Sequence, residues 1–249
     1  MQITAAPFAQ WIKGKPQSAV AIVVGFKQPI RESPERTVEN VDLQITAYDV
    51  DGRTYGNSRS RADVAIRAGA TGTAEYEVFG KIDLKPGRYQ LRVAAFLTSF
   101  DTAGSVYFDV DVPDFATQAI SMAGLLVSAK PSPYFAPKDL LVSLVPVIPT
   151  TRRVFAATYT VTGFTRVYQG RKGRVADVPA RVTVRDSEDK VLLDRQMPLA
   201  ANQFTNGRSA DLQFDVPVAD LQPGHYLLTV EAGTGPAVVR RDSRFQIVK

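Results

Sequence analysis

The sequence predicts an all-β protein made of two tandem β-sandwich domains of the immunoglobulin or fibronectin type III kind. The first observation behind this prediction is an internal repeat: residues 83–95 and 220–232 are identical at eight of thirteen positions. Ordinary residue frequencies would give about one identity in such a window. The second observation is a hydrophobic period of two in both windows, which is typical of a strand with one buried face. Two copies of one β-rich domain explain both observations.

The repeat keeps a constant spacing of 137 residues beyond this window. At that spacing, Asp49 matches Asp186 and Phe108 matches Phe245. We place the domain boundary at Pro113, because proline cannot continue a central ladder, and this gives domains of residues 1–113 and 114–249. Three apolar residues of the first copy also match apolar residues of the second: Ile45, Ala47 and Val110 fall on Val182, Val184 and Ile247.

Each copy has a turn of the form Leu-x-Pro-Gly-x-Tyr ahead of the repeated strand. Proline presets φ in such a turn, and glycine can adopt the positive φ that a side chain would resist. The turn delivers Tyr89 to the start of one strand and Tyr226 to the start of the other. In a tyrosine corner, a tyrosine at this position donates a hydrogen bond from its hydroxyl to the backbone a few residues upstream. We predict that both tyrosines form such a corner.

Apolar runs and alternating patterns predict the remaining strands, and no long helical period competes with them. Clusters of Gly, Pro, Asn and Asp separate these runs. The expected strands are residues 19–26, 41–48, 73–78 and 105–112 in the first copy, and residues 119–128, 156–164, 180–185, 212–216 and 243–248 in the second.

The composition excludes several classes of protein. A hydrophobic fraction of 45% with 22% charged residues is typical of a globular chain. No apolar run approaches the roughly 20 residues of a membrane-spanning helix. The absence of cysteine removes disulfides, zinc thiolate sites and thiol nucleophiles.

Residues 1–10 lack the pattern of a signal peptide, so the chain is either cytoplasmic or part of a longer exported protein, and we favour the second.

The net charge of +5 belongs to the second copy. Residues 1–113 contain 13 basic and 13 acidic residues, whereas residues 114–249 contain 17 and 12. Nucleic-acid binders usually gather basic residues in runs interleaved with aromatic residues. The densest basic groups here are short and fit solvated strand edges and turns better, so we expect no nucleic-acid partner. These groups are Arg152–Arg153, Arg171–Arg174 and Arg240–Arg241.

Several stretches between Leu84 and Phe155 carry a resemblance to a known family: Leu84 to Tyr89 with Val93, Gly104 to Val106, Val112 to Phe115, Leu125–Leu126, and Pro149 to Phe155. Together they resemble the C-terminal β-rich region of bacterial von Willebrand factor A related proteins. In that family, a von Willebrand A domain with a metal-dependent adhesion site precedes the region, and the proteins are typically exported. This sequence has no Asp-x-Ser-x-Ser motif, so the metal site transfers to none of its residues. The resemblance implies an extracytoplasmic, multidomain parent.

Two acidic turns are the candidate metal sites. Asp49 and Asp51 have the spacing that begins a calcium loop, but the downstream carboxylate of the full pattern is absent. The equivalent turn of the second copy contains Asp186 and Asp189. A hairpin turn is the alternative interpretation of both segments. The four aspartates are therefore weak calcium candidates. The sequence predicts no other metal site and no cofactor site.

No catalytic residue is assigned from the sequence. The single histidine, His225, follows the turn of the second repeat, is expected to face solvent and has no prepared partner nearby. We therefore expect a non-enzymatic structural or protein-interaction module, with other domains of the parent or a protein partner as ligand. The alternative is a carbohydrate-binding or adhesive module, which would need two or three coplanar aromatic residues on one sheet face or in one groove. The outward candidates are Tyr48, Tyr55 and Tyr107.

Overall fold

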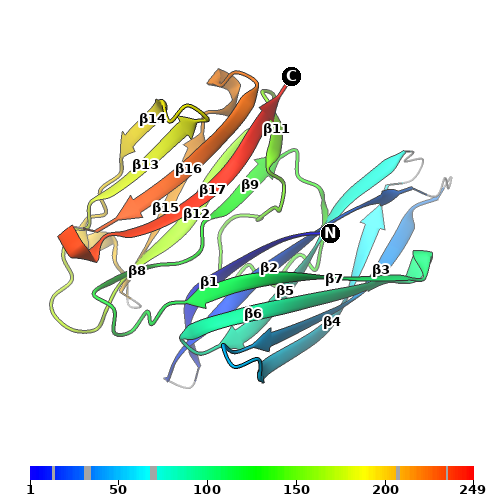
Figure 1. Cartoon of the computed structure of the whole chain (residues 1–249), viewed down its shortest axis with the longest axis horizontal. Helices are drawn as coiled ribbons and strands as arrows, with labels where there is room; N and C mark the ends of the chain where they lie inside the picture. The colour runs from blue at the N-terminus through cyan, green and yellow to red at the C-terminus, as the bar shows by residue number, and fades with distance from the viewer. Residues whose placement is uncertain (13–14, 31–34, 68–71, 206–207, 234) are drawn as a thin grey trace. The chain divides into compact units, whose positions relative to one another are not determined.

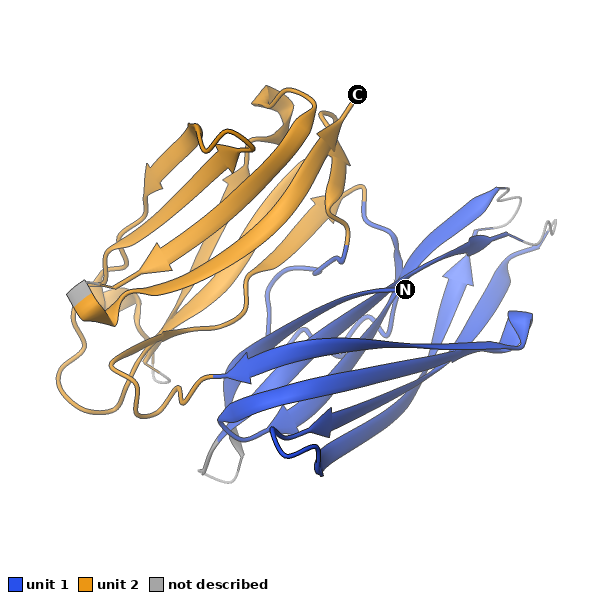
Figure 2. Cartoon of the chain, in the orientation of Figure 1, with its two compact units in different colours: residues 1–112, 132–151 blue, residues 113–131, 152–249 orange. Residues whose placement is uncertain are grey.

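The computed structural model describes residues 1–12, 15–30, 35–67, 72–205, 208–233 and 235–249. Within these residues the protein is all-β, with strands β1 to β17 and four three-residue 3-10 turns, η1 (Thr98–Phe100), η2 (Ala201–Gln203), η3 (Val218–Asp220) and η4 (Gly235–Ala237) (Figure 1). The chain divides into two compact units (Figure 2). Unit 1 contains residues 1–112 and 132–151, and unit 2 contains residues 113–131 and 152–249.

Unit 1 has two four-stranded sheets. One has the order β1 (Gln2–Ile12), β2 (Lys15–Pro29), β5 (Thr73–Leu84) and β10 (Tyr134–Ala136). The other has the order β4 (Thr54–Ile66), β3 (Thr37–Tyr48), β6 (Gly87–Leu97) and β7 (Thr102–Val112). Alternate residues of both sheets face a shared apolar core, as a sandwich requires. Fully buried members of that core include Ile22, Val24, Leu91 and Val93.

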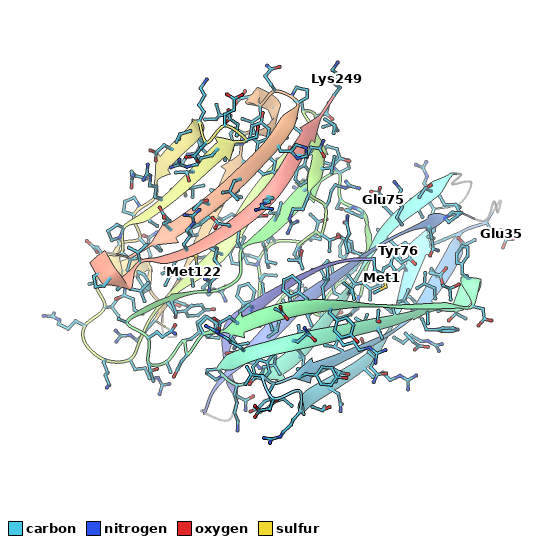
Figure 3. All side chains as sticks on the ribbon, viewed as in Figure 1. Met1, Glu35, Glu75, Tyr76, Met122 and Lys249 are labelled. Carbon is cyan, nitrogen blue, oxygen red and sulfur yellow. The ribbon has the colours of Figure 1, made fainter. Side chains whose placement is uncertain are left out.

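A buried polar chain links the two sheets of unit 1. The Tyr76 hydroxyl on β5 donates to Gln28 Oε1 on β2 over 2.7 Å, and Gln28 Nε2 donates to Glu39 Oε2 on β3 over 3.0 Å (Figure 3 labels Tyr76). The backbone N–H of Ser99 donates to the other Glu39 oxygen over 3.2 Å. Burial, followed by the nearby Glu39, raises the pKa of Tyr76. Each link satisfies a buried polar group that would otherwise destabilise the fold.

Unit 2 repeats the sandwich with extra short strands. Its larger sheet has the order β11 (Val154–Ala156), β17 (Val239–Val248), β16 (Gly224–Ala232), β13 (Ala180–Asp186) and β14 (Val191–Gln196). In the second sheet, β12 (Thr160–Gln169) lies between β15 (Ser209–Val216) on one side and β8 (Ile120–Met122) and β9 (Leu126–Lys130) on the other. A second apolar cluster fills the space between these sheets, and it includes Phe155, Val182, Phe214 and Leu228.

The predicted spacing of 137 residues holds in the centre of the sheet that contains β3 and β6 and of the sheet that contains β13 and β16. Ile45 on β3 faces Val93 on β6, and Val182 on β13 faces Val230 on β16. The pairings with the next strand share a further irregularity. The register between β3 and β4 shifts after Ala47, and the register between β13 and β14 shifts after Val184, its counterpart. The two units therefore share a bulge as well as a strand order.

The spacing fails at the last strand of each repeat. Tyr89 faces Val110 on β7, whereas Tyr226 faces Phe245 on β17. Val110 therefore corresponds to Phe245, at a spacing of 135, and the expected matches of Phe108 with Phe245 and of Val110 with Ile247 are wrong. The sequence match hid the change because a shift of two residues keeps the same side chains facing the core.

Unit 1 is completed by residues 132–151, which follow the first part of unit 2 in the chain. In this segment β10 pairs in parallel with β5, and the Phe135 ring stacks on Phe79 with 5.3 Å between centroids. At the end of the segment, Glu77 Oε1 accepts hydrogen bonds from Thr150 Oγ1, Thr151 N and Thr151 Oγ1 over 2.7, 2.6 and 2.9 Å. The chain therefore changes unit three times, at residues 112, 131 and 151, whereas the sequence predicts one change at residue 113.

Candidate functional site

The acidic turn of unit 1 is held together by its own first carboxylate. Asp49 Oδ1 accepts hydrogen bonds from the backbone N–H groups of Asp51 and Arg53 over 3.0 and 2.9 Å. Gly52 has a φ of +76° and donates its N–H to the Asp49 carbonyl over 3.0 Å. The Asp51 carboxylate lies 3.4 Å from the Arg53 guanidinium at an exposed position. Both acidic groups thus serve the hairpin between β3 and β4.

Unit 2 builds the same turn with different residues. Asp186 Oδ1 accepts from the backbone N–H groups of Glu188 and Lys190 over 2.9 and 3.0 Å. Asp189 occupies the position of Gly52 with a φ of 64°, and its carboxylate lies 3.0 Å from the Arg185 guanidinium. In the described part of the chain, no three His, Asp or Glu side chains are gathered as a metal site would need. The four calcium candidates are therefore placed in two separate turns, and the first carboxylate of each turn is bonded to backbone.

Beside the turn of unit 1 lies a hollow of about 760 Å³, the unit 1 hollow. Two of the three aromatic candidates, Tyr48 and Tyr107, line it, and the Tyr107 side chain is 55% exposed. Gln90 Nε2 donates to Asp109 Oδ1 over 3.2 Å on the same outer sheet face. The hollow therefore combines exposed aromatic surface with polar groups that can form hydrogen bonds. Its lining is Tyr48, Asp49, Val50, Gly52, Arg88, Tyr89, Gln90, Tyr107, Asp109, Val110 and Asp111.

The third aromatic candidate lies elsewhere. Tyr55 packs against Tyr89 with 5.1 Å between ring centroids and is not among the lining residues. Tyr55 is the extra residue of the bulge in β4, between Thr54, which faces Tyr48, and Gly56, which faces Ala47. A bulge changes the direction of side chains along its strand. The alternation of residues in the sequence does not show that Tyr55 lies outside the hollow that Tyr48 and Tyr107 line.

A second hollow, the unit 2 hollow, occupies the equivalent place beside the acidic turn of unit 2. Its volume is about 380 Å³. It lies over β11, β17 and β16, where Val154 faces Gln246 and Gln246 faces His225 in adjacent strands. The lining is Arg153, Val154, Asp186, Ser187, His225, Tyr226, Leu227, Arg244, Phe245 and Gln246.

The two hollows carry opposite charge at matching positions. With the register of the final strands taken into account, Asp109 of unit 1 corresponds to Arg244 of unit 2. Gln90 faces Asp109, whereas its counterpart Leu227 faces Arg244. The unit 2 hollow is also lined by Arg153, which immediately precedes β11. The same fold position is therefore polar and aromatic in one unit, and cationic and apolar in the other.

The unit 2 hollow includes a serine, a histidine and an aspartate, which are the residue types of a nucleophilic triad. His225 is exposed as expected, and among the described residues its imidazole has no hydrogen-bond partner. The Asp186 carboxylate is bonded to the turn amides. Ser187 is exposed at the tip of the same turn. A nucleophilic triad needs hydrogen bonds from nucleophile to base and from base to acid, and neither contact is present in this arrangement.

The two repeated tyrosines differ in their contacts. The Tyr226 hydroxyl donates to the carbonyl of Gln222, four residues upstream, over 2.6 Å, and its ring stacks on Phe245 with 5.4 Å between centroids. Tyr89 is also buried, but its ring packs against Tyr55. Burial, followed by the neighbouring Tyr55 and Asp49, raises the pKa of Tyr89 to about 12. Both tyrosines stand at the inner edge of a hollow and support its floor.

The sequence did not single out Arg153 or Arg244 as members of one site. The sequence pattern places Arg153 only in a short basic group and gives Arg244 no particular role. The signal that could have found Arg244 is the contrast with the acidic residue at the equivalent position, and the spacing of 137 conceals that contrast because the true spacing of these strands is 135.

Comparisons with known proteins identify no family. Neither a scan against protein-family models nor a search of curated proteins finds a match. The chain is similar to a solved structure of a putative β-galactosidase from Bacteroides fragilis, with 12% identity and a TM-score of 0.30, over 91% of this chain and 32% of that one. It is also similar to β-glucuronidase from Parabacteroides merdae, with 11% identity and a TM-score of 0.32, over 92% of this chain and 27% of that one.

At these scores neither likeness bears on the chemistry of this chain. The chain also spans less than a third of the length of either structure. The resemblance to von Willebrand factor A related proteins rests on the quoted residues alone, because no family model matches. None of the helical segments in the described residues is long and apolar enough to span a membrane.

Proposed function

We propose that the chain is a non-enzymatic structural or protein-interaction module of an exported, multidomain bacterial protein, formed by two sandwiches of the fibronectin type III kind. The strand order supports this assignment. In unit 1, β1, β2 and β5 form one sheet and β4, β3, β6 and β7 form the other. In unit 2, the corresponding groups are β8 or β9 with β12 and β15, and β14 with β13, β16 and β17. Such sandwiches serve many cell-surface proteins.

The observation that carries the proposal is the contrast between a repeated frame and unlike hollows. Both units keep the same central register, the same bulge and the same turn held by a carboxylate. The side chains that line the hollow beside that turn differ between the two units. Rigid sheets that present variable surface residues are the usual plan of a binding scaffold. The resemblance to von Willebrand factor A related proteins supports an extracytoplasmic parent, whose other domains would be natural partners.

The experiment is a quantitative capture assay coupled to cross-linking. The intact chain is immobilised, exposed to envelope extract of the source organism, and compared with the heat-unfolded chain on the same support. We expect a defined protein to be retained and cross-linked to outer-face residues of the folded chain only. Hydrolysis of a panel of chromogenic glycosides or esters, abolished by His225→Ala, would overturn the non-enzymatic assignment.

The second candidate function is carbohydrate binding, and the unit 1 hollow is the specific observation that favours it. Tyr48 and Tyr107 line one hollow with Gln90 and Asp109. An aromatic ring can cover the apolar face of a sugar, while amide and carboxylate groups bond to its hydroxyls. A glycan array with the native chain tests this function. A bound glycan should be lost with Tyr107→Ala and retained with Tyr55→Ala, and equal loss in both variants would contradict a site in this hollow.

A further inference from the structure

The unit 2 hollow contains an arginine without a partner. Three arginines lie on β17. Arg240 pairs with Asp242 over 3.0 Å, and Arg241 donates to the carbonyls of Met122 and Ala123 over 2.7 and 3.1 Å. Arg244 is exposed and, among the described residues, has neither an ion pair nor a side-chain hydrogen bond. Its donors are therefore available to a ligand.

The surroundings of Arg244 favour a negatively charged group. The residue that faces it across the strands is Leu227, and Arg153 and His225 also line the hollow. The single acidic residue of the lining, Asp186, already accepts two backbone hydrogen bonds. A guanidinium group binds a carboxylate through paired hydrogen bonds, and such charge-assisted bonds are the stronger ones.

The net charge of unit 2 also favours a negatively charged ligand. Unit 1 contains 14 basic and 14 acidic residues, whereas unit 2 contains 16 basic and 11 acidic residues. The excess of five positive charges therefore belongs entirely to unit 2. A net positive unit attracts an acidic partner over distances up to about the Debye length of 8 Å at physiological ionic strength.

The apolar part of the lining favours a peptide over a sugar as the ligand. Leu227 is half-buried, and Val154 is 47% exposed. The aromatic rings of the lining, Tyr226 and Phe245, are both buried and stack on each other with an angle of 26° between their planes. They offer no open face to a sugar ring. An aliphatic side chain fits this surface better, and about 380 Å³ is room for a few side chains.

We propose that the unit 2 hollow binds a short acidic peptide segment of a partner protein, with a carboxylate on Arg244 and an aliphatic side chain against Leu227 and Val154. This proposal rests on the interaction function proposed above and names the chemistry of the partner. The equivalent hollow of unit 1 would reject the same peptide, because Asp109 takes the place of Arg244.

The probe is a fluorescein-labelled peptide Gly-Asp-Asp-Leu-Asp-Asp-Gly, titrated into the intact chain and followed by fluorescence polarisation. Arg244→Asp, which installs the residue type found in unit 1, should weaken binding at least tenfold. The matched control is Arg195→Asp, because Arg195 is exposed on β14 of the same sheet and lies outside the hollow. It should change affinity less than about twofold, as expected for a distant exposed charge.

A second variant tests the apolar contact. Leu227→Gln, which copies Gln90 of unit 1, should weaken binding of the peptide. It should leave unchanged the affinity for a control peptide that has Gly in place of Leu. NMR amide shifts on titration should be confined to residues 153–154, 225–227 and 244–246. Circular dichroism confirms that each variant is folded.

Three outcomes would overturn the proposal: no binding of the peptide to the native chain, equal loss with Arg244→Asp and Arg195→Asp, or tighter binding of polygalacturonate that depends on Arg244 in the same way. The last would assign the hollow to an acidic polysaccharide. If the Arg244→Asp chain still retains the cross-linked partner of the capture assay, the interaction function stands and the hollow is not its site. If the native chain retains no partner but binds the peptide through Arg244, the hollow stands and the interaction function needs another test.

Discussion

Replacing Glu77 with alanine should release the end of segment 132–151 from unit 1. The side chain is 3% exposed, and its Oε1 atom accepts one bond from the Thr150 hydroxyl and two from Thr151. Alanine leaves three buried donors without this acceptor. The Thr151 N–H is the most costly of them, because a backbone donor cannot rotate to find another partner.

The expected loss is about 3 kcal/mol. A buried donor left without an acceptor costs about 1–3 kcal/mol, and a typical net hydrogen bond contributes about 1 kcal/mol. Three donors share one oxygen, so their contributions do not simply add. A loss of about 3 kcal/mol increases the opening equilibrium of the segment by roughly a hundredfold. Thr150→Val removes one of the three donors and should cost about 1 kcal/mol.

The assay is native-state hydrogen exchange of the Thr151 amide, with tryptic cleavage after the exposed Lys138 as a second measurement. Glu75→Ala is the matched control, because Glu75 is exposed on the same strand and its carboxylate lies 3.7 Å from the Lys27 ammonium (Figure 3 labels Glu75). Such surface pairs contribute about 0–1 kcal/mol. The reasoning is refuted if Glu77→Ala changes the Thr151 amide protection no more than Glu75→Ala does.

Three further predictions concern single buried groups. Tyr226→Phe removes the bond to the Gln222 carbonyl and should lower the free energy of unfolding by about 1 kcal/mol in urea titrations; an unchanged midpoint would contradict a role for the hydroxyl. Among the described residues, the fully buried Ser121 Oγ has no hydrogen-bond partner, so Ser121→Ala should raise the thermal midpoint of unfolding, and a lowered midpoint would contradict this reasoning. Burial raises the pKa of Tyr89 to about 12, so the unfolded chain ionises first and stability should fall between about pH 10 and 12. Tyr89→Phe should flatten that fall in denaturation curves taken across this range, and equal slopes would contradict it.

The sequence predicts the central strands well, because they alternate against a core on one face. The window containing Tyr89 lies in β6, and residues 180–185 lie in β13. The edge strands β4 and β14 were not predicted. Their outer residues are polar or exposed, so the alternation that identifies a buried face is weak there. Strand β1 was also missed, and it contains Pro7, which is tolerated because β1 is an edge strand.

Two predicted strands of the second copy differ in extent. The run expected at residues 119–128 is divided into β8 and β9, because the register against β12 shifts by one residue between Met122 and Leu126. The strand expected at residues 156–164 begins at Thr160, after a turn in which the Tyr159 N–H donates to the Ala156 carbonyl. A hydrophobic pattern alone does not reveal such a bulge or turn, since the apolar residues on either side remain buried.

The candidate site was predicted in part. The acidic turns, His225 and two of the three aromatic residues border the hollows that the structure contains. The hollows themselves depend on which residues of β6 face β7, and of β16 face β17. That pairing depends on the length of each hairpin, which hydrophobic periodicity does not determine.

The three changes of unit along the chain mean that one cut cannot separate the two sandwiches. A break after Val112 would leave the first fragment without β10 and without the threonines that bond to Glu77. A break after Thr151 would deprive the second fragment of β8 and β9. For genetic recombination, the pair is therefore a single cassette, and a crossover that exchanges one repeat would have to replace two separate stretches of the gene together.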